Sequence, residues 1–423
     1  MTVTMRAGRW LALLCVCSLA TIPAATHAGE SDHFQQDPVQ GQAEQDQAAG
    51  LNKTAEQYLE QWKLTEAEGL LKRALELTEQ ASGPDHPDTA RSLDRLAELY
   101  SLQERYAEAE QLLKRALAIY EKAPVKVEVP AKEPAPVEEK APVKEPAPAK
   151  AKAPAKAKAP AKRKIRVKPH PDTGRILDEL GGLYEAQENY PEAERFYKQA
   201  LDMCRRALGK DHPDLAPIFV HLAGIYNGRR WFSSAERFYQ RALEITEQAL
   251  GKDHPDTAER LGDLAFFYRE QGKYEEAEPL YLRALEIDER ALGKDHPGTA
   301  QILGELAALE ATLEQDAEAE SLFTRALAIH RQVHGEDHPD TAESLHDLAV
   351  FYRDRGRYAE AEPLYQRLFN GAGKTRGPDH AQIVPWLESY ADLLRKTGRR
   401  DEAAGLEARA AAIRAKSGAP RRN

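Results

Sequence analysis

Residues 251–292, GKDHPDTAERLGDLAFFYREQGKYEEAEPLYLRALEIDERAL, are the clearest copy of a 42-residue unit that recurs along most of this 423-residue chain. The histidine of the D-H-P-D turn recurs at multiples of 42 residues, at His86, His170, His212, His254, His296, His338 and His380. A fixed period of this size predicts a repeat architecture, in which neighbouring units stack and bury one shared core. Residues that recur with the period are therefore expected, first of all, to hold the stack together.

Each unit is predicted to contain two amphipathic helices, because apolar side chains fall at helical spacing in residues 256–271 and again in residues 274–290. The apolar positions are Leu261, Leu264, Ala265 and Tyr268 in the first helix, and Tyr274, Ala277, Leu280, Tyr281, Ala284, Leu285 and Ile287 in the second. Gly272 lies between the helices, where a tight turn requires a left-handed backbone. The alanines leave room for neighbouring helices to approach closely.

The turn between units contains the residues that helix ends require. Gly251 is expected to end one helix, and Pro255 fixes the entry to the next. We expect Asp256 to accept hydrogen bonds from the first free amides of that helix, and Glu259 to complete a capping-box-like pattern. Asp340 and Glu343 repeat the pair two units later.

The patterns L-x-x-L-A-x-x-Y and G-x-Y-x-E-A-E-x-L-Y-x-R-A-L resemble the tetratricopeptide repeat, and the D-H-P-D-T turn resembles its 42-residue, kinesin-light-chain-type variant. The resemblance implies an all-α, right-handed α-solenoid of helix-turn-helix units, interrupted by a disordered Pro/Ala/Lys-rich linker. WD40 and HEAT repeats have similar periods, but the first are all-strand and the second lack the E-A-E…R-A-L spacing. The first helices of eight units are expected to start near residues 47, 88, 172, 214, 256, 298, 340 and 382.

Residues 1–28 are predicted to be a secretory signal peptide. Arg6 and Arg9 precede an apolar run, and small residues around Ala28 fit a cleavage site. The run is short for a membrane span of about 20 residues, so the mature chain is expected to lack a transmembrane segment. The expected location is the periplasm of a bacterial cell, with an uncleaved anchor as the alternative.

Residues 123–168 are predicted to be a disordered basic linker. They consist almost entirely of Ala, Pro, Lys, Glu and Val, a composition that cannot form a packed core. Thirteen Lys and Arg against five Glu give this segment a net charge of +8. The whole chain carries −10, so the repeat units on either side are strongly acidic.

The linker divides the chain into two groups of units. Residues 29–46 are expected to be a flexible N-terminal segment, and residues 47–122 to hold two units. Residues 169–415 are expected to hold six units including a C-terminal cap, followed by a disordered tail at 416–423. Two units fall below the usual minimum of about three for a stable array. We therefore expect the N-terminal pair to form a separate small module.

No enzymatic signature stands out in the sequence. It contains no G-x-x-x-x-G-K-[ST], G-x-G-x-x-G, H-E-x-x-H or G-x-S-x-G motif. Cys204 lacks a nearby partner in sequence and is expected to face neighbouring helices. The Asp and His residues of the turns are potential metal ligands, but successive turns are one unit apart, so we expect them to order turns and cap helices rather than bind metal. We expect no enzymatic activity, no cofactor and no metal.

The concave surface is the expected binding site. By the resemblance, first helices line a surface that holds extended peptides, and an Asn directly before the L-A pair grips the peptide backbone. No unit here keeps that Asn; the position holds Lys53, Arg95, Glu179, His221, Asp263, Glu305, Asp347 and Ser389. The other concave candidates are Asn227, Phe266, Arg269, Val350 and Arg353.

These features favour a non-enzymatic interaction scaffold of the cell envelope, which binds a peptide or protein partner in an acidic groove. The alternative is a structural spacer whose lysine-rich linker touches anionic polymer or lipid. A further hypothesis is that the basic linker docks on its own solenoid, against Glu179, Asp263, Glu305 and Asp347. Nucleic acid is an unlikely partner of an exported protein.

Overall fold

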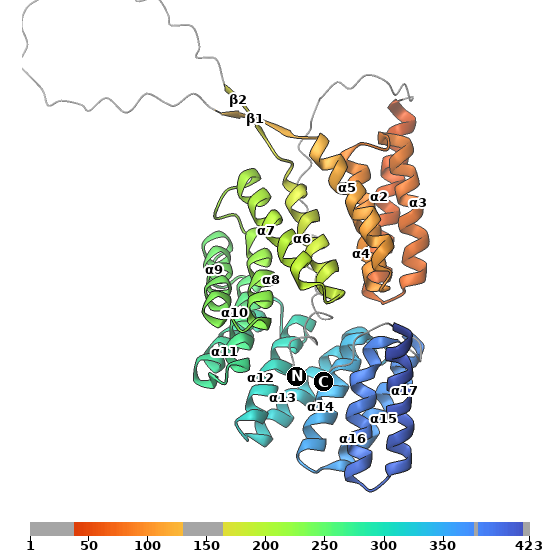
Figure 1. Ribbon diagram of the computed structural model, residues 1–423, viewed down its shortest axis with the longest axis vertical. Coiled ribbons are helices and arrows are strands. Elements are labelled where there is room, and N and C mark those ends of the chain that lie inside the picture. The colour runs from red at the N-terminus through yellow and green to blue at the C-terminus, as the bar shows by residue number, and fades with distance from the viewer. Residues whose placement is uncertain (1–37, 130–163, 376–379, 418–423) are drawn as a thin grey trace, which may run out of the picture.

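The computed structural model describes residues 38–129, 164–375 and 380–417, and within them sixteen α-helices form eight successive antiparallel pairs (Figure 1). The first helices of the pairs are α2 (Pro38–Glu60), α4 (Pro87–Leu102), α6 (Pro171–Ala186), α8 (Leu215–Gly228), α10 (Pro255–Glu270), α12 (Pro297–Thr312), α14 (Pro339–Asp354) and α16 (Val384–Lys396). The second helices are α3 (Leu64–Ser82), α5 (Tyr106–Lys122), α7 (Tyr190–Ala207), α9 (Phe232–Leu250), α11 (Tyr274–Ala291), α13 (Asp316–His334), α15 (Tyr358–Thr375) and α17 (Arg400–Ser417). A short 3₁₀ turn, Ala381–Ile383, precedes α16. The predicted all-α solenoid is confirmed.

Small residues set the distance between paired helices. Ala265 on α10 and Ala277 on α11 have no exposed surface, and Tyr281 packs in the same hydrophobic cluster. Because a close-packed interior tolerates neither gaps nor overlaps, an alanine at these positions fixes how closely the two helices approach.

In five of the inter-unit turns the histidine is the N-cap residue of the following α-helix. The N-cap residue of α8 is Asp214 instead, and His380 caps the 3₁₀ turn before α16. His254 Nδ1 accepts the amide of Asp256 at 3.2 Å, and Thr257 Oγ1 donates to the carbonyl of Gly251 at 2.7 Å. The cap was expected at Asp256 and is instead His254, because α10 begins one residue earlier, at Pro255. The D-H-P-D-T motif therefore satisfies the start of one helix and ties it to the end of the previous one.

The turns inside the units require a left-handed backbone, and not all of them use glycine. Gly272 has a φ of 71° in the fifth unit, whereas Glu314 holds a φ of 60° at the same position of the sixth. Trp62, Glu104, Glu188 and Arg230 occupy it in the first four units. These residues adopt a left-handed backbone conformation that glycine adopts without strain and that costs energy for a residue with a Cβ atom.

The N-terminal pair of units belongs to the same solenoid as the other six, so the expected separate module is wrong. Leu113 of α5 and Leu180 of α6 belong to one continuous hydrophobic core. Tyr184 donates its hydroxyl to Glu110 at 2.6 Å across the same junction. The first helix also begins earlier than expected, since α2 covers part of the segment 29–46 that was predicted to be flexible.

Two short strands close the ends of the inserted segment. β1 (Val125–Val129) pairs antiparallel with β2 (Lys164–Lys168), with Val125 opposite Lys168. The prediction that all of residues 123–168 are disordered is therefore wrong at both ends; residues 130–163 lie outside the described part of the chain. The two paired strands bring residues 125 and 168 close together, so α6 packs on α5 in spite of the inserted segment (Figure 1).

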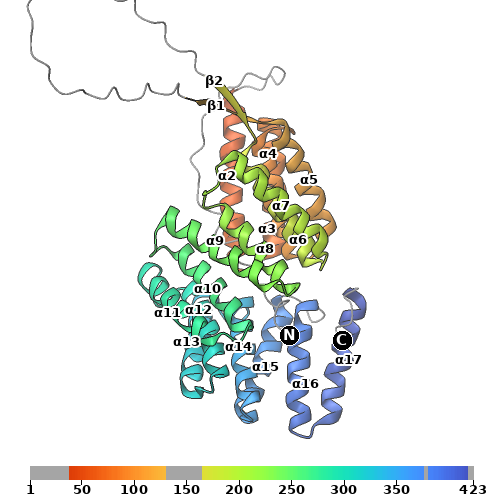
Figure 2. The same cartoon turned by 60° about the vertical axis from the view of Figure 1, so that its left-hand side comes forward.

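The solenoid curves until its two ends meet. In both views the lower ends of the first two units lie above the last units of the chain (Figures 1 and 2). Trp62, between α2 and α3, packs edge-on against His338, with 6.2 Å between ring centroids. Glu104, between α4 and α5, lies 3.6 Å from Nε2 of His380. We refer to these two pairs as the closure contacts.

Candidate protein-binding surface

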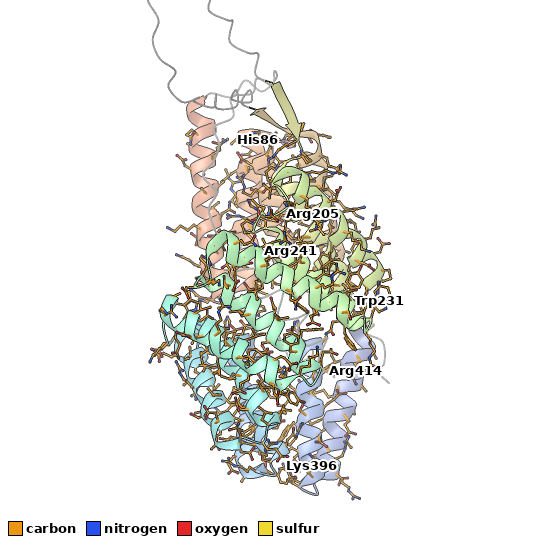
Figure 3. The ribbon with its side chains drawn as sticks, turned by 90° about the vertical axis from the view of Figure 1, so that its left-hand side faces the viewer. His86, Arg205, Trp231, Arg241, Lys396 and Arg414 are labelled. Atoms are coloured by element: carbon orange, nitrogen blue, oxygen red, sulfur yellow. The ribbon has the colours of Figure 1, made fainter. Side chains whose placement is uncertain are left out.

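The first helices line the inner, more tightly curved face of the solenoid. Successive first helices α10, α12, α14 and α16 touch one another directly, whereas the contacts between successive second helices are weaker. The second helices form the outer face, where ion pairs such as Arg283–Glu247 at 2.8 Å and Arg325–Glu289 at 2.7 Å join neighbouring units. Figure 3 looks onto this outer side and shows Arg205 on α7 and Arg241 on α9, two neighbouring second helices.

The ten residues predicted for the groove lie on first helices, but they divide into two groups by burial. Five are almost fully buried: His221, Asn227, Asp263, Phe266 and Glu305. The other five keep part of their surface exposed: Glu179, Arg269, Asp347, Val350 and Arg353. The first group holds the units together, and the second can touch a partner.

His221 shows what the buried group does. Its Nδ1 lies 3.0 Å from the carboxylate of Asp178 in the preceding unit, and its ring stacks on Tyr197 at 4.8 Å. Burial alone would lower the pKa of His221, but Asp178 overrides that effect, so the pKa lies above its ordinary value. The pair links α6 to α8 where the family pattern would place a peptide-gripping Asn.

Two arginines at the same position of the unit reach across to the next first helix. Arg269 pairs with the Glu305 carboxylate at 3.1 Å and donates to its carbonyl at 3.2 Å. Arg353 lies 3.6 Å from Asp392 and donates to the carbonyl of Ser389 at 3.5 Å. These arginines fix the angle between neighbouring units and leave part of each guanidinium on the inner face.

The inner face carries less uncompensated negative charge than the acidic composition of the chain suggests. Asp263 pairs with Arg260 at 3.2 Å, Glu305 pairs with Arg269, and Glu179 accepts from Arg175 at 2.7 Å. These three carboxylates were expected to attract the basic linker, and each already has a cationic partner in its own solenoid. The linker residues 130–163 lie outside the described part of the chain.

A strip of small and apolar residues runs along the inner face at one repeat position. Its members are Gly182, Gly224, Phe266, Ala308 and Val350, spaced 42 residues apart on five successive first helices. A side chain added at Gly224 would point into open space. Only Phe266 and Val350 were predicted from the sequence; aligning the units on their turn histidines reveals the other three. We refer to these five residues as the inner strip.

Cys204 is a core residue, as predicted. Its thiol is buried against Gly174 of α6, and burial raises the pKa of Cys204 to about 12. The thiolate, which is the reactive form, is therefore scarce at neutral pH.

The sequence matches the tetratricopeptide repeat model over residues 46–122, 172–248, 261–332, 302–372 and 344–416, which is well over half of the chain. The protein belongs to the tetratricopeptide repeat family. Its 42-residue units and their D-H-P-D-T turn resemble the kinesin-light-chain-type variant of that repeat.

Two solved structures illustrate the similarity. BtubC (BKLC) of P. vanneervenii is 22% identical with a TM-score of 0.44, and the match covers 58% of this chain and 94% of that one. A Podosopora anserina protein assigned as a kinesin light chain, with nearly identical TPR-like repeats, is 26% identical with a TM-score of 0.40, covering 49% of this chain and 98% of that one. A comparison with curated proteins gave no match. Within residues 38–129, 164–375 and 380–417, none of the helices combines the length and the apolar character that a membrane crossing requires.

Proposed function

We propose that this solenoid is a non-enzymatic scaffold that binds an extended segment of a partner protein along its inner face. Tetratricopeptide solenoids generally act through protein–protein interaction, and stacked repeats present elongated concave surfaces of this kind. The observation that carries the proposal is the inner strip, which repeats at one position over five units and is bordered by partly exposed charges.

The inner strip defines the chemistry of the partner. Gly182, Gly224 and Ala308 leave space for a backbone to approach closely, and the partly exposed Val350 offers an apolar contact, whereas Phe266 is almost fully buried and forms the floor of the strip. Glu343 and Asp347 border Val350 on α14, and Asp347 is about one-third exposed. An extended segment with small or apolar side chains and interspersed lysine or arginine complements this surface.

The location that we propose is the cell envelope, reached by export. Its support is the sequence of residues 1–28, which the structure does not describe. N-terminal sequencing of the protein from the exported fraction is expected to begin near Gly29; a chain that still begins with Met1 would argue against export with cleavage.

Site-specific photo-crosslinking in the native cell tests the binding surface. A photoreactive residue at Val350 is expected to give a discrete cross-linked product. The matched control is Leu282, an apolar residue of α11 on the outer face that is 48% exposed, and it is expected to give none. Products from Leu282 alone, or from neither position, would rule out the inner face as the binding surface.

A second variant separates the scaffold from the spacer alternative. Replacing residues 130–163 by Asn-Gly joins the strands β1 and β2 through a two-residue turn. A partner held on the inner face still cross-links to Val350 in this variant. If the linker itself makes the attachment, the product at Val350 disappears.

A further inference from the structure

The turn between the sixth and seventh units departs from the repeat pattern at two positions that face each other. Four residues before the turn histidine, the third, fourth and fifth units end in Leu208, Leu250 and Leu292, whereas the sixth has His334. Eight residues before it, the same units have Cys204, Thr246 and Asp288, whereas the sixth has His330. Both changes are to histidine, on one face of α13, immediately before a turn that already contains His338.

The fold brings three of these side chains together. His334, His338 and Asp340 each place one ligand atom so that all three atoms lie within 4.8 Å of one another. Nε2 of His334 is 3.5 Å from the Asp340 carboxylate, and Nδ1 of His338 is 3.6 Å from the same oxygen. All three residues are half-buried, so the cluster is reachable from solvent and yet partly enclosed.

We propose that His334, His338 and Asp340 form a binding site for a divalent transition-metal ion of the Zn²⁺, Co²⁺, Ni²⁺ or Cu²⁺ group. Two imidazoles and one carboxylate are a ligand set that these ions favour over Mg²⁺ or Ca²⁺, which prefer oxygen alone. Water completes the coordination. The other turns have the histidine and most have the aspartate, but the three aligned leucines show that they lack the second imidazole.

Neighbouring groups support the two imidazoles. The His334 and His338 rings stack with 4.1 Å between centroids, so a bound ion requires one ring to turn its nitrogen toward the other. His334 can turn because it is the last residue of α13, followed by Gly335 with a φ of 86°. His330 stands one helical turn behind, with its ring centroid 6.1 Å from that of His334, and its Nδ1 is 2.8 Å from Ser344.

The site also lies at a closure contact, since Trp62 packs against His338. An ion held by His334 and His338 fixes the turn on which Trp62 rests. Metal binding is therefore expected to stabilise this turn by linkage, because the ion binds only where the turn is folded.

The test is isothermal titration of the full chain, without a histidine tag, with Zn²⁺, together with visible absorption on addition of Co²⁺. We expect one saturable site at pH 7.5 and weaker binding at pH 5.5, because imidazole ligands must be deprotonated and protons compete with the metal ion for them. The His334→Leu variant is expected to lose at least about tenfold in affinity. Leucine occupies this position in three other units, so the fold tolerates it.

The matched control is His254→Ala, which removes an equivalent turn histidine whose unit has Leu250 in place of His334. It is expected to bind Zn²⁺ as the wild type does. His338 is not the variant of choice, because its Nδ1 accepts the amide of Asp340 at 3.2 Å and its loss weakens a helix cap. A neutral imidazole has one lone-pair nitrogen, so an ion bound by His338 takes the place of this hydrogen bond. Absence of saturable binding, or binding unchanged by His334→Leu, overturns the proposal.

Discussion

At the residue scale, the repeated histidine is explained by helix capping. Seven turns present the same acceptor to the amide two residues on, at 3.1–3.3 Å. The sequence alone placed the cap at the aspartate, since Asp is a common capping residue and His is not. Only the structure shows that, in five of these turns, the proline after the histidine is already the first residue of the helix.

Removing one cap tests this role. His254→Ala is expected to lower the free energy of unfolding by about 1 kcal/mol, because the Asp256 amide loses its acceptor. His254→Asn offers another side-chain acceptor at the same place and is expected to recover most of the loss. Urea unfolding followed by circular dichroism measures both variants; an alanine variant as stable as wild type would contradict capping.

A buried aspartate predicts an unusual dependence on pH. Asp288 occupies the same repeat position as His330, one unit earlier. His330 contacts the hydroxyl of Ser344, but the residue that corresponds to Ser344 in the earlier unit is the apolar Ile302. Burial, with a contribution from Glu259, raises the pKa of Asp288 to about 7. The folded state therefore keeps the proton to a higher pH than the unfolded chain does, and stability falls as pH rises from about 4 to 7.

The Asp288→Asn substitution imitates the protonated carboxyl group and therefore removes the loss of stability that occurs as the pH rises. The variant is expected to be more stable than wild type at pH 8 by about 1–3 kcal/mol, with a smaller difference at pH 5. Urea unfolding at the two pH values gives the comparison. A difference that does not change with pH would show that Asp288 does not titrate in this range.

At the element scale, the helices and their pairing were predictable because the apolar positions and alanines repeat with the unit. The strands β1 and β2 were not. Their residues alternate Val or Ile with charged residues within a segment whose overall composition is that of a disordered linker. Pairing residue 125 with residue 168 is a non-local contact that no local pattern reveals.

Gly181 tests the close approach of α6 and α7. A methyl group at Gly181 would lie 2.5 Å from the Tyr197 ring, which is fully buried. Gly181→Ala is expected to cost about 1–3 kcal/mol through overpacking, in spite of the better helix propensity of alanine. Gly69→Ala is the control, because a side chain there meets nothing within 4 Å, and it is expected to stabilise by roughly 0.5–1 kcal/mol. Thermal unfolding distinguishes the two; equal effects would contradict the packing argument.

At the scale of the whole molecule, the number of repeats and the solenoid architecture could be predicted from the sequence. The residues that face a partner could be predicted only in part. Asp263 and Glu305 looked like groove residues because the unit places them on the inner side. Arg260 lies three residues before Asp263 on α10, whereas Arg269 reaches Glu305 from the preceding first helix, so the second pairing depends on unit-to-unit geometry.

The shared core predicts that the units do not unfold independently at the junction. Deleting residues 38–122 uncovers the side of α6 that packs on α5, including Leu180. The remaining chain is expected to show early loss of amide protection in α6 and α7, measured by hydrogen exchange, and a lower urea midpoint. Unchanged protection in α6 would mean that the N-terminal units contribute nothing to the rest.

The most direct test of the account is the distance between the two ends of the solenoid in solution. Spin labels at Gln61 and Glu336, next to the Trp62–His338 contact, are introduced into a chain in which Cys15, Cys17 and Cys204 are replaced by serine, and the distance is measured by double electron–electron resonance. One continuous array of eight units whose ends meet predicts a single narrow distribution at short distance. A broad distribution at long distance would contradict it, because the N-terminal units would then be moving independently of the other six.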